Sequence, residues 1–261
     1  MTDVATSVAN KPAWIDLSSQ DAAGSRSFYG QLFGWSVDVN SDPLYGGYAI
    51  ARINGKDVAG ISPAMSAETP TAWSLYIGTD EADMTSMKVA EAGGSVVAPA
   101  FDVPGQGRMA VYQDSSDAFI SVWQPFSMGG FGTSGANTYG WAELNARNVQ
   151  DDLAFYQEVF GWTAKTSPMP EGAPPYTEFQ LDGVSIAGAQ EMSPGLPAEV
   201  PSYWLVYFSV DDVDASCQKA AGLGAKPMVM PMDFPGGRFA ILSDPQGAMF
   251  GLLKTAPRSS M

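Results

Sequence analysis

No histidine occurs anywhere in the 261-residue sequence. This absence excludes Ser-His-Asp and Cys-His nucleophile pairs, histidine-ligated zinc, and the iron centre built from histidines and one carboxylate. A metal would have to be held by carboxylate, carbonyl and water oxygens, a ligand set that suits magnesium, calcium or manganese. Acid–base chemistry in this chain therefore falls to Asp, Glu, Tyr or Lys side chains.

Cysteine is nearly absent too. Cys217 is the single cysteine, so the chain cannot form an internal disulfide. It lies in the helix-like segment DASCQKAAGLG, and the chain has no histidine that could activate it. We therefore expect Cys217 to be a buried packing residue.

Long apolar runs and basic clusters are also missing. The sequence has no apolar run of about 18 residues, the length of a membrane span, and its N-terminus lacks the basic start of a secretion signal. Lys and Arg total 13 against 28 Asp and Glu, which gives a net charge of −15. An acidic surface repels phosphate groups. We expect a cytoplasmic protein that binds neither nucleic acid nor membrane.

The sequence does contain a long internal repeat. Residues Trp14–Trp35 (WIDLSSQDAAGSRSFYGQLFGW) return as Trp141–Trp162 (WAELNARNVQDDLAFYQEVFGW), and later segments repeat at nearly the same offset. Such self-similarity indicates duplication of a folding unit. The Gly- and Ser-rich stretch Pro125–Tyr139 predicts a linker between the copies. We place the two domains at residues 10–126 and 140–256, with the linker at 127–139.

Each copy shows one order of elements twice: a strand, a helix and three strands. In the first copy the alternating WIDLS predicts a strand, and the following segment has helical spacing that ends at Gly34 as a C-cap. The dipeptides Asn54-Gly55 and Asp182-Gly183 are strong hairpin signals at matching positions of the two copies.

The motifs within this order resemble the vicinal oxygen chelate superfamily, which includes glyoxalase I, bleomycin-resistance proteins and extradiol dioxygenases. The resemblance rests on FYGQLFGW and FYQEVFGW in the first helix of each copy, TDEADM and VDDVDA before the second, and SDPQG at Ser243–Gly247, with QDSSD as a weaker version. More narrowly, the chain resembles two-domain glyoxalase-like proteins of actinobacteria. The resemblance implies an α+β fold of two tandem domains, each made of paired βαβββ modules with curved sheets enclosing a cavity.

The resemblance also gives the positions at which metal-dependent members hold their metal. The matching residues are Trp14 and Trp141 on the first strand, Ser74 and Leu205 before the second helix, and Ser121 and Gly251 on the last strand. The third-strand position falls on Ile50 or Arg52 in one copy and on Glu178 or Gln180 in the other. A lone carboxylate does not hold a metal, so the resemblance implies no metal and no cofactor in either copy.

Strand alternation indicates what lines the cavities instead, because residues two apart in a strand share a face. If Trp14 and Trp141 point inward, so do Asp16 and Glu143. The candidate ligand-binding residues are Trp14, Tyr76, Trp123, Trp141, Tyr207, Met249, Arg52 and Gln180, and the candidate acid–base residues are Asp16, Glu143 and Glu178. This lining suits a flat, partly apolar molecule. In the alternative interpretation the tryptophans fill the cavities as core.

Three functions stay open. The first is metal-independent binding of a small hydrophobic or aromatic molecule, as in bleomycin-resistance members of the superfamily. The second is a metal-free enzyme, a lyase, isomerase or hydroxylase-like protein, acting on such a molecule in secondary metabolism or aldehyde detoxification, with Tyr76 or Tyr207 as proton donor. The third is an assembly scaffold, which requires filled cavities. We expect a monomer or homodimer, and structural ion pairs at Arg108 and Arg238.

Overall fold

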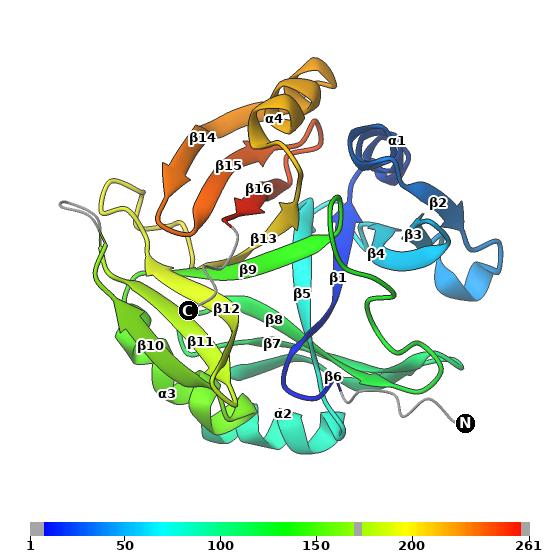
Figure 1. The fold of residues 1–261 in the computed structure, drawn as a ribbon. Helices are drawn as coiled ribbons and strands as arrows, with labels where there is room; N and C mark the ends of the chain where they lie inside the picture. The colour runs from blue at the N-terminus through cyan, green and yellow to red at the C-terminus, as the bar shows by residue number, and fades with distance from the viewer. Residues whose placement is uncertain (1–7, 170–173, 257–261) are drawn as a thin grey trace, which may run out of the picture. The chain divides into compact units, whose positions relative to one another are not determined.

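A computed structural model describes residues 8–169 and 174–256 of the chain (Figure 1). Over these residues the order strand, helix, three strands occurs four times, as the sequence predicts. The first repeat holds two such βαβββ modules: β1 (Pro12–Ser19), α1 (Ala22–Phe33), β2 (Ser36–Val39), the short 3-10 helix η1 (Pro43–Tyr45), β3 (Ala49–Ile53) and β4 (Lys56–Pro63); then β5 (Ala72–Gly78), α2 (Ala82–Glu91), β6 (Ser95–Val103), β7 (Gly107–Gln113) and β8 (Phe119–Pro125). The second repeat holds the other two: β9 (Tyr139–Ala146), α3 (Val149–Phe160), β10 (Thr163–Ser167), β11 (Tyr176–Leu181) and β12 (Val184–Glu191); then β13 (Tyr203–Ser209), α4 (Val213–Gly222), β14 (Lys226–Phe234), β15 (Gly237–Ser243) and β16 (Met249–Thr255). None of the described helices is long and apolar enough to cross a membrane.

The strands belong to two eight-stranded mixed sheets, β1–β8 in one and β9–β16 in the other. Within the four modules the neighbours follow the orders β2-β3-β4-β1, β5-β8-β7-β6, β10-β11-β12-β9 and β13-β16-β15-β14. In every module the first strand pairs in parallel with the last. The four modules therefore share one topology, and the chain has the predicted α+β class.

Contacts divide the chain into two compact units that do not follow the repeats. Unit 1 combines the second module of the first repeat with the first module of the second repeat, mainly Leu75–Gly130 and Ala142–Trp204. Unit 2 combines the first and last modules, mainly Ile15–Ser74 and the chain from Leu205, together with Phe131–Trp141. Helices α2 and α3 pack together in unit 1, and α1 and α4 in unit 2 (Figure 1). Each unit thus draws on both repeats.

The segment between β8 and β9, predicted as a linker, has no helix or strand but is held by hydrogen bonds. The Gly132 amide donates to the Asp57 carbonyl oxygen at 2.8 Å. The Trp35 Nε1 donates to the Asn137 carbonyl oxygen at 2.7 Å. Hydrogen bonds of this kind do not define where a domain begins or ends, so the domain boundaries given above stay predictions.

The chain reverses where the sequence predicts it. Gly34 ends α1 with a φ of +73° and donates its amide to the Gly30 carbonyl oxygen, and Gly161 ends α3 with a φ of +71°. Asn54 and Gly55 both have positive φ, 51° and 75°, which is the type I′ turn that joins two twisted strands. In the turn between β11 and β12, Asp182 and Gly183 also have positive φ, 50° and 77°.

A buried hydrogen-bond chain ties the two modules of unit 2 together. The Trp73 Nε1 donates to Tyr29 Oη at 2.9 Å, and Tyr29 Oη donates to Asp244 Oδ2 at 2.9 Å. Asp244 Oδ1 accepts the amides of Gln246 and Ala248, each at 2.9 Å. Burial raises the pKa of the Asp244 carboxyl, and these donors act against that rise.

Unit 1 contains the same network, but here the tyrosine comes from the second repeat and the aspartate from the first. The Trp204 Nε1 donates to Tyr156 Oη at 2.8 Å, and Tyr156 Oη donates to Asp114 Oδ2 at 2.6 Å. Asp114 Oδ1 accepts the amides of Ser116 and Ala118 at 2.9 and 2.8 Å. The tyrosine of each FY motif and the aspartate of each SD or QD motif are therefore joined by a buried hydrogen bond, one in each unit.

Asp152 adds a second buried carboxyl to unit 1. Its side chain is fully buried, and Ser115 Oγ donates to its Oδ1 at 2.8 Å. Its Oδ2 accepts no hydrogen bond from the residues that the structure describes. Burial, and then the charge of Asp114, raise the pKa of Asp152 to about 6. The matching residue of α1 is Ser25, which pairs with Ser19 Oγ at 2.7 Å.

We expect Tyr29→Phe and Tyr156→Phe each to lower the free energy of unfolding by about 1–3 kcal/mol, because each removes the tyrosine's hydrogen bond to Oδ2 of a buried carboxylate and the acceptor of a buried indole N–H. Chemical denaturation measures the loss. Ser27→Ala, on the exposed side of α1, is the control and should change stability by less than about 0.5 kcal/mol. A similarly small loss at both tyrosines would contradict the role of the network.

Asp152 should make the stability depend on pH. Its pKa is higher in the folded than in the unfolded chain, so its protonation favours folding at low pH and this contribution is lost as the pH rises through about 6. We expect Asp152→Asn to stabilise the protein by roughly 2 kcal/mol at pH 7.5 and by less at pH 5. Unfolding curves at both pH values test this, with Asp151→Asn, its exposed neighbour, as the control. A gain that is equal at both pH values would disprove titration of Asp152.

Candidate functional site

One strand face of the first repeat carries a carboxyl–phenol pair. Asp16 lies in the middle of β1, opposite Gly60 of β4, which in turn lies opposite Ile50 of β3. Tyr48 directly precedes β3 and donates its Oη to Asp16 Oδ1 at 2.6 Å. This short distance is typical of a charge-assisted hydrogen bond to a carboxylate.

Gly60 makes room for this pair. A Cβ placed on Gly60 would overlap both Asp16 Oδ1 and Tyr48 Oη. Gly60 is absent from the residues with positive φ, so its backbone conformation would accept an alanine. The glycine is therefore explained by the Asp16 and Tyr48 side chains, which occupy the space that a Cβ at position 60 would need. A glycine inside a strand often marks such a close approach of other groups.

The second repeat carries a different arrangement at the matching place. Glu143 of β9 lies opposite Gly188 of β12 and is buried. Gln190 Nε2 donates to Glu143 Oε1 at 2.9 Å and to Asn145 Oδ1 at 3.0 Å. Burial, and then the charge of Glu143, raise the pKa of the neighbouring Tyr203. A carboxamide therefore holds Glu143, where a phenol holds Asp16.

The remaining polar candidates lie on β3 and β11. Glu178 is half-buried and lies opposite Gly188 and Lys165. Gln180 Nε2 donates to Ser185 Oγ at 3.2 Å.

Arg52 is held at both ends of its guanidinium. Its Nε donates to Asp57 Oδ1 at 2.6 Å and its Nη1 to Asp38 Oδ2 at 2.5 Å. Contact of Arg52 with a ligand stays a prediction and would have to compete with these two carboxylates.

The aromatic candidates are mostly buried. Trp14, Tyr76, Trp123 and Tyr207 are exposed over 7% of their surface or less, while Trp141 and Met249 are half-buried. Trp123 Nε1 donates to the Met128 carbonyl oxygen at 2.8 Å. Burial fits both interpretations of the tryptophans, as ligand-lining residues and as core, so their binding role stays a prediction.

The two arginines that follow glycine in β7 and β15 form structural ion pairs, as predicted. Each guanidinium bridges a carboxylate in the first turn of a helix and a second one on the neighbouring strand. The pairs are Arg108 with Asp83 and Asp102, and Arg238 with Asp214 and Asp233.

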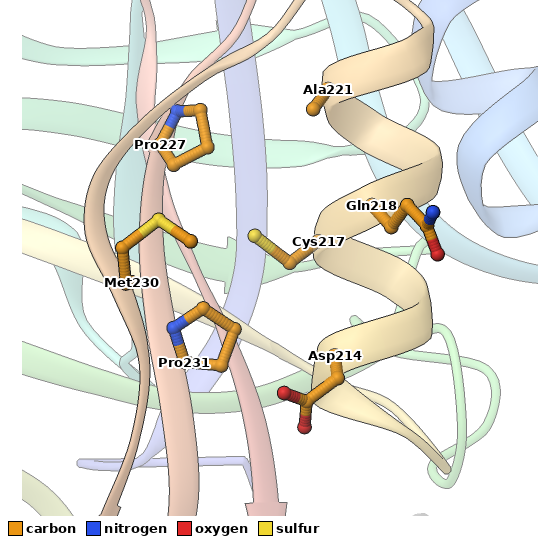
Figure 2. A pocket seen from close by; sticks show the side chains of 7 residues that line it. All are labelled: Asp214, Cys217, Gln218, Ala221, Pro227, Met230 and Pro231. Atoms are coloured by element: carbon orange, nitrogen blue, oxygen red, sulfur yellow. The ribbon is translucent and has the colours of Figure 1, made fainter.

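A cavity of about 370 Å³ lies between α4 and β14 (Figure 2). Cys217 points from α4 towards Met230 on β14, with Pro227 and Pro231 beside it (Figure 2). Cys217 is 4% exposed, and burial raises the pKa of its thiol. The prediction of a buried packing cysteine is confirmed.

Comparison with known proteins identifies the family. The chain matches the "Glyoxalase/Bleomycin resistance protein/Dioxygenase superfamily" over residues 138–252. It is 39% identical over 253 residues to the "Putative glyoxylase CFP32" of Mycobacterium tuberculosis (strain CDC 1551 / Oshkosh), covering 95% of each chain. The chain belongs to this superfamily. It is also 35% identical over 260 residues to the "Anthracycline biosynthesis protein DnrV" of Streptomyces peucetius, covering 93% of this chain and 92% of DnrV.

Solved structures support the same fold. The Mn(II)-bound glyoxalase from Novosphingobium aromaticivorans aligns with a TM-score of 0.64 at 17% identity, over 97% of this chain and 85% of that one. The 2,2',3-trihydroxybiphenyl 1,2-dioxygenase of Sphingomonas wittichii strain RW1 aligns with a TM-score of 0.62 at 12% identity, over 94% and 91% of the two chains. At these identities the likeness establishes the fold and not the activity.

The residues present do not fit the metal of such superfamily members. Gly251 stands where the last-strand carboxylate is expected, and a Cβ there would overlap the ring of Tyr207, its partner in register on β13. Among the described residues, no three His, Cys, Asp or Glu side chains lie together as a metal site would need. The Tyr207 ring thus occupies the space that a side chain at position 251 would take.

Sequence reasoning missed Tyr48 and Gln190. Tyr48 lies just outside β3 and 32 residues from Asp16, and Gln190 lies 47 residues from Glu143. The one signal that could have found them is the glycine at the matching position of β4 and β12, Gly60 and Gly188, because a strand glycine often marks a close approach of other groups.

We expect the purified protein, after dialysis, to hold far less than one equivalent of zinc, iron, nickel or manganese per chain, because the matched positions offer no ligand set. Elemental analysis measures the content. About one equivalent of any of these metals in the dialysed wild-type protein would contradict the prediction, and its loss in Glu178→Gln would place the metal at the matched third-strand position.

Proposed function

We propose that this protein binds a small, flat, partly aromatic molecule without a metal, on the strand faces that carry Trp14 and Asp16. The observation that carries the proposal is the Tyr207 ring lying over Gly251, where metal-dependent members are expected to hold a carboxylate. A ligand on such a face depends on aromatic contacts and a few placed hydrogen bonds rather than on metal coordination.

The names of two relatives support a flat aromatic ligand. DnrV and DauV, both from Streptomyces, are named for anthracycline biosynthesis. Anthracyclines are flat, fused-ring aromatic molecules, and many of them carry an amino sugar. The residues proposed to contact such a ligand are Trp14, Arg52, Tyr76 and Trp123 in the first repeat and Trp141, Gln180, Tyr207 and Met249 in the second.

A metal-free enzyme is the second candidate, favoured by the 2.6 Å hydrogen bond between Tyr48 and Asp16. A positioned carboxylate can act as a general base, and such catalysis typically contributes at least about 10²-fold to a rate. Of the three proposed bases, Asp16 fits better than Glu143, because Asp16 is half-buried whereas Glu143 is only 6% exposed; Glu178 is the third. Turnover that Asp16→Asn abolishes while binding persists would favour the enzyme.

We expect an anthracycline to quench the tryptophan fluorescence of the protein, and Trp14→Ala and Trp141→Ala to weaken its binding by roughly 1–3 kcal/mol, as loss of a stacking partner does. Titration by fluorescence and calorimetry gives the affinities. Phe126→Ala, which removes an exposed aromatic ring, is the control and should leave affinity unchanged. Strong loss of stability without any loss of affinity in both tryptophan variants would mean that these side chains are core.

A further inference from the structure

We propose that the cavity between α4 and β14 is a further binding site, which takes a small, neutral, aromatic molecule. Its volume of about 370 Å³ is within the range of small-molecule sites, and all of its lining residues belong to unit 2. The lining contains none of the residues proposed for the strand faces. This inference therefore does not depend on the function proposed above.

The cavity lies where the two repeats differ. In the first repeat Tyr112 of β7 lies against α2, and its Oη shares a hydrogen bond of 2.9 Å with Ser86 Oγ. The matching residues of the second repeat are Leu242 and Cys217. Leu242 lies opposite Pro227, which lines the cavity, and it has neither the hydroxyl nor the full length of a tyrosine. The second repeat therefore leaves space beside its helix that a phenol fills in the first.

The walls of the cavity are apolar and carry two sulfur atoms. Figure 2 shows the Cys217 side chain pointing from α4 towards Met230 on β14, with Pro227 and Pro231 beside it. Burial raises the pKa of the Cys217 thiol, so the thiol stays protonated at pH 7 and acts as a polarisable apolar group. Sulfur atoms make favourable contacts with aromatic rings. These walls therefore suit a flat ring better than a polar chain.

The cavity is open to solvent on the side of β14. Met230 is 67% exposed, and Met228 and Met232 on the same strand are 60% and 48% exposed. Methionine side chains are unbranched and adapt to different apolar partners, which makes them common on binding surfaces. A ring between Met230 and Cys217 would remove this apolar surface from water, which is the main driving force for binding.

The charges at the cavity favour a neutral ligand. Arg238 holds Asp214, a lining residue, because its Nε donates to Oδ2 at 2.7 Å and its Nη2 to Oδ1 at 2.8 Å. Arg238 Nη1 also donates to Asp233 Oδ1 at 2.9 Å. One guanidinium with two carboxylates is net negative, as is the whole chain at −15. An anion is therefore repelled, and a cation would have to compete with Arg238 for Asp214.

The test follows methionine methyl groups by NMR in the full chain, labelled with isotope in these methyl groups, with 2-naphthol as the neutral aromatic probe. The Met230 signal is assigned from its loss in Met230→Leu. We expect 2-naphthol to shift the Met230 signal through its ring current, with a shift that saturates as the probe concentration rises. Met65, which is 98% exposed and outside the lining, is the internal control and should not shift.

Two more probes test the class of ligand. We expect the anion 2-naphthoate to bind at the Met230 site at least about 10-fold more weakly than 2-naphthol, because its charge must leave water beside a net negative cluster. The saturated analogue, decahydro-2-naphthol, should bind at least about 3-fold more weakly, because it has no aromatic ring to contact the sulfur atoms.

A matched pair of variants tests the place. Ala221 faces β14 from an exposed position of α4 (Figure 2), and Ala221→Leu should weaken 2-naphthol binding at least about 10-fold by filling the cavity. Ala215→Leu makes the same change at an exposed position of α4 outside the lining and should change the affinity by less than about 2-fold. Leucine is a good helix former, and thermal melts verify that both variants are folded.

The outcomes separate this site from the strand faces, because the Met249 methyl group reports on the ligand of the proposed function. A saturable shift at Met230 that Ala221→Leu weakens supports the cavity, whatever Met249 shows. No shift at Met230, a shift that does not saturate, or equal affinities in wild type and Ala221→Leu overturn it. Equal affinities for 2-naphthol and 2-naphthoate overturn the neutral ligand, and equal affinities for 2-naphthol and its saturated analogue overturn the aromatic one.

Discussion

Both units depend on a buried tyrosine that links a tryptophan indole to an aspartate. In unit 2 the tyrosine comes from the first repeat and the aspartate from the second, 215 residues away. In unit 1 Tyr156 comes from the second repeat and Asp114 from the first. Neither repeat contains a complete network, because each supplies a tyrosine to one unit and an aspartate to the other. The duplicated motifs are therefore complementary halves, and their role in holding the modules together explains why both copies carry the FY and SD or QD patterns.

The two faces of the first strand in each repeat differ in what their side chains contact. In β1, Ile15 and Leu17 are fully buried on one face, while Asp16 lies on the other and pairs with Tyr48. Packing fixes the first face, since loss of a buried apolar group leaves a cavity. The second face carries the differences between repeats, Asp16 with a phenol against Glu143 with a carboxamide. Divergence on this face leaves the core packing intact.

The sequence predicts the elements well because local signals decide them. Glycines at the ends of α1 and α3 and the Asn-Gly and Asp-Gly turns lie where expected. The buried networks, by contrast, join residues that no local pattern connects. Asp152 shows the difference: it stands in the first turn of α3, where an acidic residue favours the helix and is normally exposed. The turn that carries Ser115, a residue of the other repeat, buries it. Tyr48 escaped prediction for the same reason, because it directly precedes β3 and its partner lies two strands away on β1, in the order β2-β3-β4-β1, and not beside it in the sequence.

A carboxylate on the strand face can be held by a metal or by hydrogen bonds from the protein. Coordination would hold such a group in a fixed place and neutralise its charge. Without a metal, a half-buried carboxylate needs hydrogen-bond donors, since an unpaired charge away from water is costly. The second repeat supplies a donor from Gln190 and closes the site within the protein. In the first repeat the Tyr48 hydroxyl donates to Asp16 Oδ1 at 2.6 Å. Matching strand positions therefore carry carboxylates that different groups hold, a carboxamide in one repeat and a phenol in the other.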